Sequence, residues 1–483
     1  MTLKPLLIIA LALSVRLTAA AQDEAAPPDS LLTEDQAAAA ADEADRLDPE
    51  IAMANEADTI NLPPSGWAVL LPKCARPDSN YIQMPGGESR EMQILVDKLD
   101  SVLLFGSGRV SIVHIGGSHV QADMYTEEFR QRIDSLNNGL RPPRGYLFPF
   151  RVAKTNNPQG YRVAWGGKWD KARCSVRKPR PALGIDGIAV WTSEPDAWIQ
   201  FNLDPRGTGR WQTTRLRVLG RCESGSRRRQ LTPVIDAAGA LTRPEVYDSA
   251  TMAYTFTLPR AVTDFTLRLE RSRDTIPDSL RVAGTGEPTF YLDGIVPDND
   301  DDGIVYHTIG VNGAAVVHYL RCEYFEREMA ALRPDLVIMS IGVNDASGPN
   351  FSPEVFMNNY DQLARLFRRI NPDCAFIFIT NNDTKRRAGR RRRVVNKNGP
   401  LAQDAFAQIA TKWQGGLWDL FEVMGGLGSM AEWQKNGLAG RDNIHFTRLG
   451  YKVVGALLYD AFLDFYLNQE PADEAPLPPD TTE

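Results

Sequence analysis

The sequence is poor in cysteine and histidine, with five of each in 483 residues. The cysteines stand at positions 74, 174, 222, 322 and 374 and form no C-x-x-C pair, so neither a zinc site nor a redox dithiol is supported. Because five is odd, at least one thiol lacks a partner within the chain, and a pairing of Cys174 with Cys222 stays open. We predict that the protein needs no metal and no cofactor.

Excess positive charge is also lacking. Lysine and arginine number 54 against 61 acidic residues, which gives a net charge of −7 and argues against a general nucleic-acid binder. Beyond the N-terminus, no run of apolar residues is long enough to span a bilayer, so we expect no stable membrane insertion.

The N-terminal residues are typical of a secretory signal peptide. Lys4 supplies the positive start, residues 6–15 the apolar core, and residues 19–21 an A-x-A cleavage site. A membrane anchor is the alternative, but the apolar run is short and Arg16 interrupts it. We therefore expect residues 1–21 to be removed by cleavage near Ala21, and the mature protein to be periplasmic or extracellular.

Composition divides the remaining chain. Residues 22–62 and 471–483 are acidic and rich in alanine or proline, which predicts a disordered leader and tail. Residues 151–297 consist of short alternating segments between Gly, Pro, Asp and Asn, a pattern that favours an antiparallel β-sandwich. Residues 63–150 and 298–470 alternate strands with helices, which predicts one α/β domain interrupted by the β-rich insertion.

In the α/β portion, apolar runs predict buried strands and three- to four-residue apolar spacing predicts helices. Strands are expected at 110–115, 303–310, 335–342, 374–380 and 415–421, and helices at 91–106, 126–136, 314–332, 353–370, 404–413 and 449–467. Such alternation implies a mostly parallel sheet covered on both faces, with reactive groups at the carboxyl ends of its strands.

Two of these strand ends carry glycine beside a polar group. Gly116 and Gly117 precede Ser118, and glycines allow a sharp turn that exposes a serine hydroxyl near a helix N-terminus. A simple helix cap is the alternative for Ser118. After the strand at 303–310, Gly313 can present its N–H to a ligand, although an ordinary turn explains this glycine better when it is taken alone.

Two further strand ends supply the remaining polar groups. Asn344 follows a buried strand, where its amide can donate a hydrogen bond to an oxyanion. Asp442 and His445 are three residues apart just before the last helix, so the carboxylate can orient an imidazole that acts as a general base. For each, a turn, cap or packed residue is the alternative.

In their order along the chain, these blocks resemble the SGNH (GDSL-type) hydrolase family, whose Ser, Gly, Asn and His blocks match Ser118, Gly313, Asn344 and His445. The resemblance implies a flavodoxin-like three-layer fold and a serine nucleophile, Ser118, with His445 as base and Asp442 as third member. It also implies an oxyanion hole made by the Ser118 and Gly313 N–H groups and the Asn344 amide.

One position departs from the family pattern, because Gly117 stands where the family usually has aspartate. The Gly-Ser-His sequence is similar to that of exported bacterial esterases that remove O-acetyl groups from glycans, which carry a carbohydrate-binding-like β-sandwich at the place of 151–297. The resemblance thus implies a secreted esterase acting on an acylated glycan such as peptidoglycan. A lipase, an O-acetyltransferase and an inactive glycan-binding protein are the alternatives.

Other features are expected to be structural. The acidic stretch at 298–303 starts like a calcium loop but lacks the glutamate that ends one. The basic stretch "KRRAGRRRR" at 385–393 is expected to be a solvated, mobile loop, with attraction of an anionic polymer as the alternative. Asp123 and Asp345 are expected to accept structural hydrogen bonds, and His119 either to touch substrate or to pack.

Overall fold

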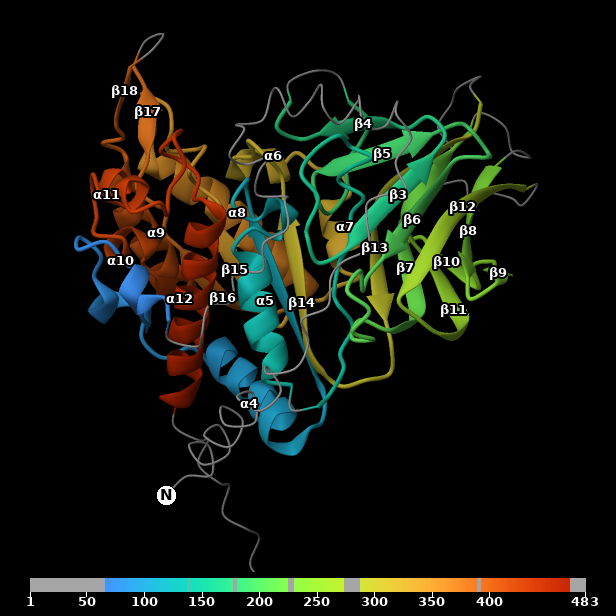
Figure 1. Ribbon diagram of the computed structural model, residues 1–483, viewed down its shortest axis with the longest axis horizontal. Coiled ribbons are helices and arrows are strands. Elements are labelled where there is room, and N and C mark those ends of the chain that lie inside the picture. The colour runs from blue at the N-terminus through green and yellow to red at the C-terminus, as the bar shows by residue number, and fades with distance from the viewer. Residues whose placement is uncertain are drawn as a thin grey trace, which may run out of the picture.

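A six-stranded sheet forms the centre of the α/β portion in the computed structural model (Figure 1). The structure describes residues 66–137, 139–176, 180–224, 230–272, 287–388 and 392–469. The strand order is β1-β19-β16-β15-β2-β14. These strands are β1 (Ile82–Gln83), β2 (Arg109–Gly116), β14 (Gly303–Gly310), β15 (Leu336–Ser340), β16 (Ala375–Ile379) and β19 (Gly416–Trp418).

All neighbouring strands of this sheet are parallel except β1, which runs antiparallel to β19. Every residue of β16 is buried, as the continuous apolar run of a strand covered on both faces requires. The register pairs Gly116 with both Gly310 and Ser340, so β2, β14 and β15 end side by side. The strand ends predicted to carry the reactive groups therefore meet at one edge.

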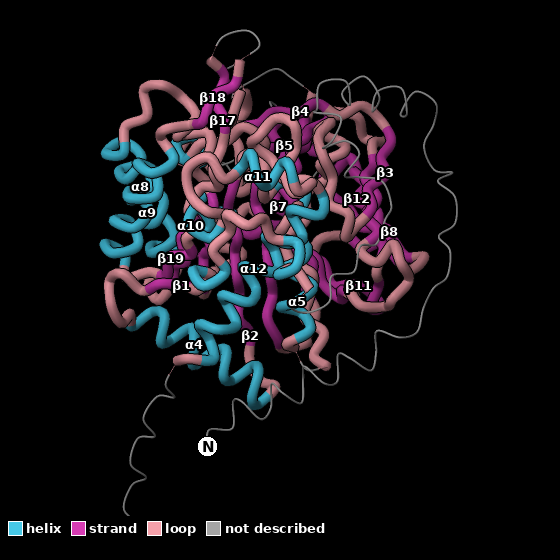
Figure 2. The backbone as a smooth tube through the Cα atoms, turned by 60° about the vertical axis from the view of Figure 1, so that its left-hand side comes forward, coloured by secondary structure: helices cyan, strands magenta, loops and turns pink. Residues whose placement is uncertain are grey.

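Helices cover both faces of the sheet (Figure 2). The buried residues of α4, α5 and α12 share one apolar cluster with Val110 and Ile112 of β2. Those of α6 to α9 share another with Val113 and Ile115, as the two-residue alternation along a strand dictates. The helices are α4 (Arg90–Phe105), α5 (Thr126–Ser135), α6 (Val316–Tyr319), α7 (Phe325–Met329), α8 (Pro353–Ile370), α9 (Gly399–Trp413), α10 (Leu420–Val423), α11 (Met430–Lys435) and α12 (Arg448–Leu467).

Between β2 and β14 the chain builds two antiparallel sheets, with orders β10-β11-β7-β13-β5-β4 and β3-β6-β12-β8-β9. Their strands are β3 (Arg162–Gly166), β4 (Asp170–Arg173), β5 (Ile188–Thr192), β6 (Trp198–Asn202), β7 (Thr213–Glu223), β8 (Gln230–Ala237), β9 (Ala240–Thr242), β10 (Val246–Asp248), β11 (Ala253–Val262), β12 (Asp264–Ser272) and β13 (Thr289–Asp298). The antiparallel character predicted for 151–297 agrees with this; a separate β-sandwich domain with those boundaries stays a prediction.

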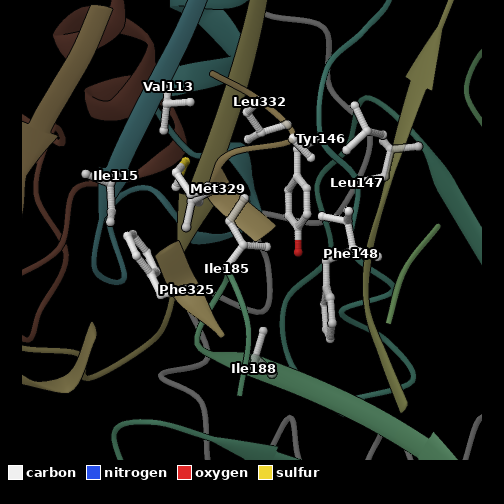
Figure 3. Packing of buried hydrophobic residues seen from close by; sticks show 14 of the residues in the cluster. Val113, Ile115, Tyr146, Leu147, Phe148, Ile185, Ile188, Phe325, Met329 and Leu332 are labelled. Carbon is white, nitrogen blue, oxygen red and sulfur yellow. The ribbon is translucent and has the colours of Figure 1, made fainter. Parts of the chain in front are cut away.

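The apolar interior is continuous between the parallel sheet and the antiparallel sheets. Figure 3 shows Ile115 and Phe325 on one side of this junction and Phe148 and Ile188 on the other, and all four belong to one buried cluster. Because protein interiors are close-packed, the β-rich insertion is held against the α/β portion by this shared core.

The single helix predicted at 314–332 is wrong, because the chain forms two short helices, α6 and α7, with a turn between them. Within the turn, the Cys322 N–H bonds back to the Tyr319 carbonyl, and the Tyr324 N–H bonds to the carbonyl of Leu183 in the β-rich insertion. A hydrogen bond to a residue 141 positions away, which helix periodicity cannot reveal, thus accompanies the break.

Other expected boundaries also differ. The helix predicted at 404–413 begins earlier, at Gly399, with Pro400 in its first turn. The strand predicted at 415–421 stops at Trp418, because the side chain of Asp419 accepts a hydrogen bond from the Glu422 N–H and caps α10. The basic stretch contains a strand pair, β17 (Lys385–Arg387) and β18 (Arg393–Val395), instead of a loop throughout.

The predicted signal peptide, acidic leader and C-terminal tail lie outside the described residues. Within the described part, no helix combines the length and apolar character needed to cross a membrane. All five cysteines are free thiols, so Cys174 is not paired with Cys222.

A buried ion cluster lies between the start of α5 and β14. Asp123 accepts from Arg130 at 3.2 Å and from Arg144 at 2.8 Å, and also from the Thr308 hydroxyl. Burial alone would raise the pKa of Asp123, but the two guanidinium groups outweigh it and hold this pKa below its usual value. Asp123 is therefore a structural acceptor that fixes α5 against β14.

We predict that Asp123→Asn lowers the free energy of unfolding by about 3–5 kcal/mol, because it removes the fully buried anion of two buried guanidinium groups and leaves them only Glu127, at 3.4 Å. Urea unfolding measures the change. The matched control is Asp373→Asn, which breaks an exposed pair with Arg90 and should cost less than about 1 kcal/mol. Equal losses in the two variants would contradict a dominant role for the buried cluster.

Candidate active site

The turn after β2 is shaped by two glycines with different surroundings. A Cβ on Gly116 would lie 2.4 Å from Val120 Cγ2 and 2.9 Å from Ser340 Oγ, so only glycine fits there. The N–H groups of Val120 and Gln121 both bond to the Gly117 carbonyl, at 3.1 and 2.9 Å. This tight turn leaves the partly exposed Ser118 at its outer side.

Ser118 does not cap α5, since that helix begins at Thr126 with Tyr125 at its N-cap. The Ser118 hydroxyl instead lies 2.7 Å from Nε2 of His445. Nδ1 of the same ring lies 2.5 Å from Oδ2 of Asp442. Three residues predicted as partners thus form one continuous hydrogen-bonded chain.

The loop that carries Asp442 and His445 is held by its own backbone. Oδ1 of Asp442 accepts from the N–H groups of Ile444 at 2.9 Å and His445 at 3.0 Å. The Thr447 side chain accepts from the Gly450 N–H and starts α12 directly after the loop. The spacing of three residues therefore folds carboxylate and imidazole onto one turn.

The electrostatics of this pair follow from the same contacts. Burial by itself would raise the pKa of Asp442, but the hydrogen bond and charge interaction with His445, with the two backbone N–H bonds, lower it to about 2. The carboxylate thus stays ionised above pH 4 and accepts the Nδ1 proton, which leaves Nε2 free to accept a proton from Ser118.

Asn344 and Gly313 lie at the neighbouring strand ends. The Asn344 amide donates to the Ala314 carbonyl at 2.9 Å, and both groups are 3.6 Å from the place where a Cβ on Gly117 would stand. Gly313 adopts a left-handed φ of +77°, which favours glycine. The Asn344 amide therefore borders the serine turn, and Gly313 directly precedes the residue that this amide contacts.

The turn that contains Gly313 is held by two side chains, Gln121 and Ser175, that the sequence analysis did not single out. The side chain of Gln121 accepts from the Asn312 N–H at 2.6 Å and donates to the Thr155 hydroxyl at 2.7 Å. The Ser175 hydroxyl donates to the Asn312 carbonyl at 3.0 Å. Thr155 and Ser175 come from the β-rich insertion, so no local sequence pattern could have revealed this contact.

His119 packs beside the base. Its ring centroid lies 5.0 Å from that of His445, and its Nδ1 is 3.0 Å from the Tyr451 hydroxyl. Burial, and the neighbouring His445, lower the pKa of His119 to about 3. His119 is buried and stays neutral at ordinary pH, which agrees with packing rather than with substrate contact.

Asp345 accepts from the Val316 N–H with both carboxylate oxygens, at 3.3 and 3.2 Å. Burial raises the pKa of Asp345 to about 7, with the N–H bond opposing the rise. The hydrogen-bond acceptor role expected for this residue agrees with the contact. Among the described residues, no group of three or more His, Cys, Asp or Glu side chains is arranged to hold a metal ion.

Residues 281–453 match the model of the GDSL-like Lipase/Acylhydrolase family. No curated protein sequence matches the chain. The structure of a peptidoglycan O-acetylesterase aligns with a TM-score of 0.61 at 20% identity, over 80% of this chain and 99% of that chain. The chain thus shares the fold of that esterase structure, and the family match over residues 281–453 confirms the resemblance that the sequence blocks indicated.

Two smaller esterase structures align over about a third of the chain. An acetyl xylan esterase gives a TM-score of 0.27 at 18% identity over 33% of this chain and 81% of that chain. A GDSL-like lipase from Bacteroides thetaiotaomicron gives 0.26 at 18% identity over 34% and 76%. These alignments are too partial to add to the fold assignment.

We predict that alanine destabilises the protein at one glycine of the turn and is tolerated at the other. Gly116→Ala should lower the free energy of unfolding by about 1–3 kcal/mol, because the new methyl group collides with Val120 and Ser340. Gly117→Ala, whose methyl group would meet only ordinary contacts, should change it by less than about 1 kcal/mol. Thermal unfolding of both variants measures the change in stability. A larger loss for Gly117→Ala than for Gly116→Ala would contradict the close contacts assigned to Gly116.

Proposed function

We propose that the protein is an exported serine esterase that hydrolyses short acyl esters, in particular O-acetyl esters, on a glycan. The observation that carries the proposal is the chain of hydrogen bonds from Ser118 through His445 to Asp442, at 2.7 and 2.5 Å. The family match to acylhydrolases supports the reaction class. The similar fold of a peptidoglycan O-acetylesterase supports a glycan ester as substrate.

In the acylation step, Oγ of Ser118 attacks the ester carbonyl carbon while Nε2 of His445 takes the hydroxyl proton. The negative oxygen of the tetrahedral intermediate is stabilised by the N–H groups of Ser118 and Gly313 and by the Asn344 amide. When the intermediate collapses, His445 returns the proton to the departing sugar hydroxyl, and an acyl-serine remains.

In the deacylation step, His445 takes a proton from a water molecule that attacks the acyl-serine, and then returns it to Ser118 as the carboxylic acid leaves. Asp442 holds the ring through Nδ1 and stabilises the imidazolium formed in each step. His119 stays neutral because its pKa is about 3, so it places no like charge against that imidazolium.

Export rests on residues 1–21 and stays a prediction from the sequence.

The glycine at position 117 removes none of the groups used in these steps, because the usual aspartate of that position belongs to neither the triad nor the oxyanion hole. An inactive glycan-binding protein is the competing hypothesis, and the next experiment separates the two.

We expect Ser118 to be the residue that a fluorophosphonate modifies, as mass spectrometry of the labelled protein will show. Ser118→Ala should abolish labelling and reduce hydrolysis of a chromogenic acetyl ester by at least about 10³-fold. Ser249→Ala, at an exposed serine of the β-rich insertion, is the control and should match the wild type. Equal rates for wild type and Ser118→Ala would favour the inactive glycan-binding protein.

Asp442→Asn should reduce kcat by about 10⁴-fold, because an amide cannot hold His445 in the required tautomer. The change should also reveal a pH-dependent loss of stability. The folded pKa of Asp442, about 2, is below that of an unfolded aspartate, so its stabilising effect is complete above about pH 5 and is lost as pH falls toward 2. The gap in Tm between wild type and variant should be constant from pH 5 to 7 and shrink at pH 3. A gap that widens at low pH would contradict this pairing.

A further inference from the structure

One strongly basic surface is not used by the reaction steps above. Seven of the nine residues at 385–393 are Lys or Arg, although the whole chain has a net charge of −7. The described part of this stretch is the hairpin of β17 and β18, in which Lys385 pairs with Val395 and Arg386 with Val394. The hairpin projects at the top of Figures 1 and 2, beyond the carboxyl ends of the parallel strands.

The base of the hairpin is fastened to the loops of the candidate active site. The Lys385 N–H donates to the Asn443 carbonyl at 2.9 Å, and the Arg393 guanidinium donates to the Asp442 carbonyl. The Asn396 side chain donates to the Ala346 carbonyl at 3.1 Å, two residues beyond Asn344. These contacts hold the cations of the hairpin at the rim of the site rather than at a remote surface.

The charges of the hairpin form no ion pair within the described part of the protein, although Lys385 interacts electrostatically with the nearby Asp383. In that part, no carboxylate forms an ion pair with Lys385, Arg386 or Arg392, and none of the three is fully buried. By contrast, Arg365 and Arg369 on α8 pair with Asp361 and Glu326. Such unpaired cations beside a site attract an anionic ligand and fix its carboxylates through charge-assisted hydrogen bonds.

We propose that Lys385, Arg386 and Arg392 form a binding site for the carboxylates of an acidic glycan, and so select a negatively charged chain whose ester lies at Ser118. The proposal rests on the esterase function and adds the charge class of its substrate. Guanidinium groups favour it because they bind carboxylates with two parallel hydrogen bonds. The carboxylates can stand on the sugar rings, as in a uronate polymer, or on peptides attached to the glycan.

The test compares binding and hydrolysis in a triple variant, Lys385→Ser/Arg386→Ser/Arg392→Ser. Arg393 is kept because it holds the Asp442 loop. Binding is measured by calorimetry in the Ser118→Ala background, so that no ester is consumed. The ligands are O-acetylated polygalacturonate, O-acetylated glycan fragments that carry peptide carboxylates, and neutral O-acetylated glucomannan.

The matched control is Arg365→Ser/Arg369→Ser/Lys412→Ser, which removes the same charge from exposed positions. These residues lie near the ends of α8 and α9, just before β16 and β19 begin, and therefore at the opposite edge of the sheet. For each variant, kcat/KM on the acidic polymer is divided by kcat/KM on a small neutral acetyl ester. This ratio cancels any general effect on folding or on the reaction itself.

We expect the hairpin variant to bind at least one acidic glycan at least about fivefold more weakly, with a matching fall in the ratio. The control variant and the neutral glucomannan should show no such change, and 0.5 M salt should remove most of the difference. The acidic ligand that loses affinity identifies whether ring or peptide carboxylates are recognised.

Equal effects in the two triple variants, or no effect in either, would overturn the proposal. So would a hairpin-dependent binding to anionic phosphatidylglycerol vesicles without any effect on the acidic glycans. If the wild type hydrolyses no ester and Ser118 stays unlabelled, but acidic glycan binding still depends on the hairpin, the esterase function fails while the binding site stands.

Discussion

The hydrogen bond between Ser118 and His445 joins residues 327 positions apart, and the rest of the arrangement depends on it. It requires the turn after β2 and the loop before α12 to meet at one edge of a parallel sheet. The sheet achieves this because parallel strands with helical crossovers bring all their carboxyl ends to the same side. The register of β2 with β14 and β15 adds the turns of Gly313 and Asn344 to that edge.

The β-rich insertion between β2 and β14 takes part in this edge rather than standing apart from it. It shares a close-packed apolar cluster with the parallel sheet. Through Ser175 and Thr155 it also contacts the Asn312 turn and the Gln121 side chain. A displacement of the insertion would therefore move the turn that carries Gly313, because hydrogen bonds join the two.

The charged side chains around the candidate site differ in whether they form ion pairs or hydrogen bonds within the described structure. On one side, Asp442 is kept ionised by its hydrogen bonds and can stabilise a charged His445. Near the start of α5, Asp123 and Glu127 together pair with two buried arginines, so these cations serve the fold. The cations Lys385 and Arg386 lie on the hairpin at the rim and form no ion pair in the described part of the chain, so the proposed acidic ligand can reach them. Pairing in the described structure thus separates charges that maintain the fold from charges available for recognition.

The order of most elements in the α/β portion could be predicted from the sequence, and Ser118, Asn344 and His445 could be proposed as candidates, because apolar periodicity and short polar turns are local properties. The break between α6 and α7 could not, since a hydrogen bond to Leu183 accompanies it. Nor could the hydrogen bond made by Ser175, which depends on packing between segments far apart in the chain. Sequence alone thus determined most of the elements and the candidate reactive groups, whereas only the tertiary structure decided which distant groups meet, because such contacts depend on packing and register that no local pattern encodes.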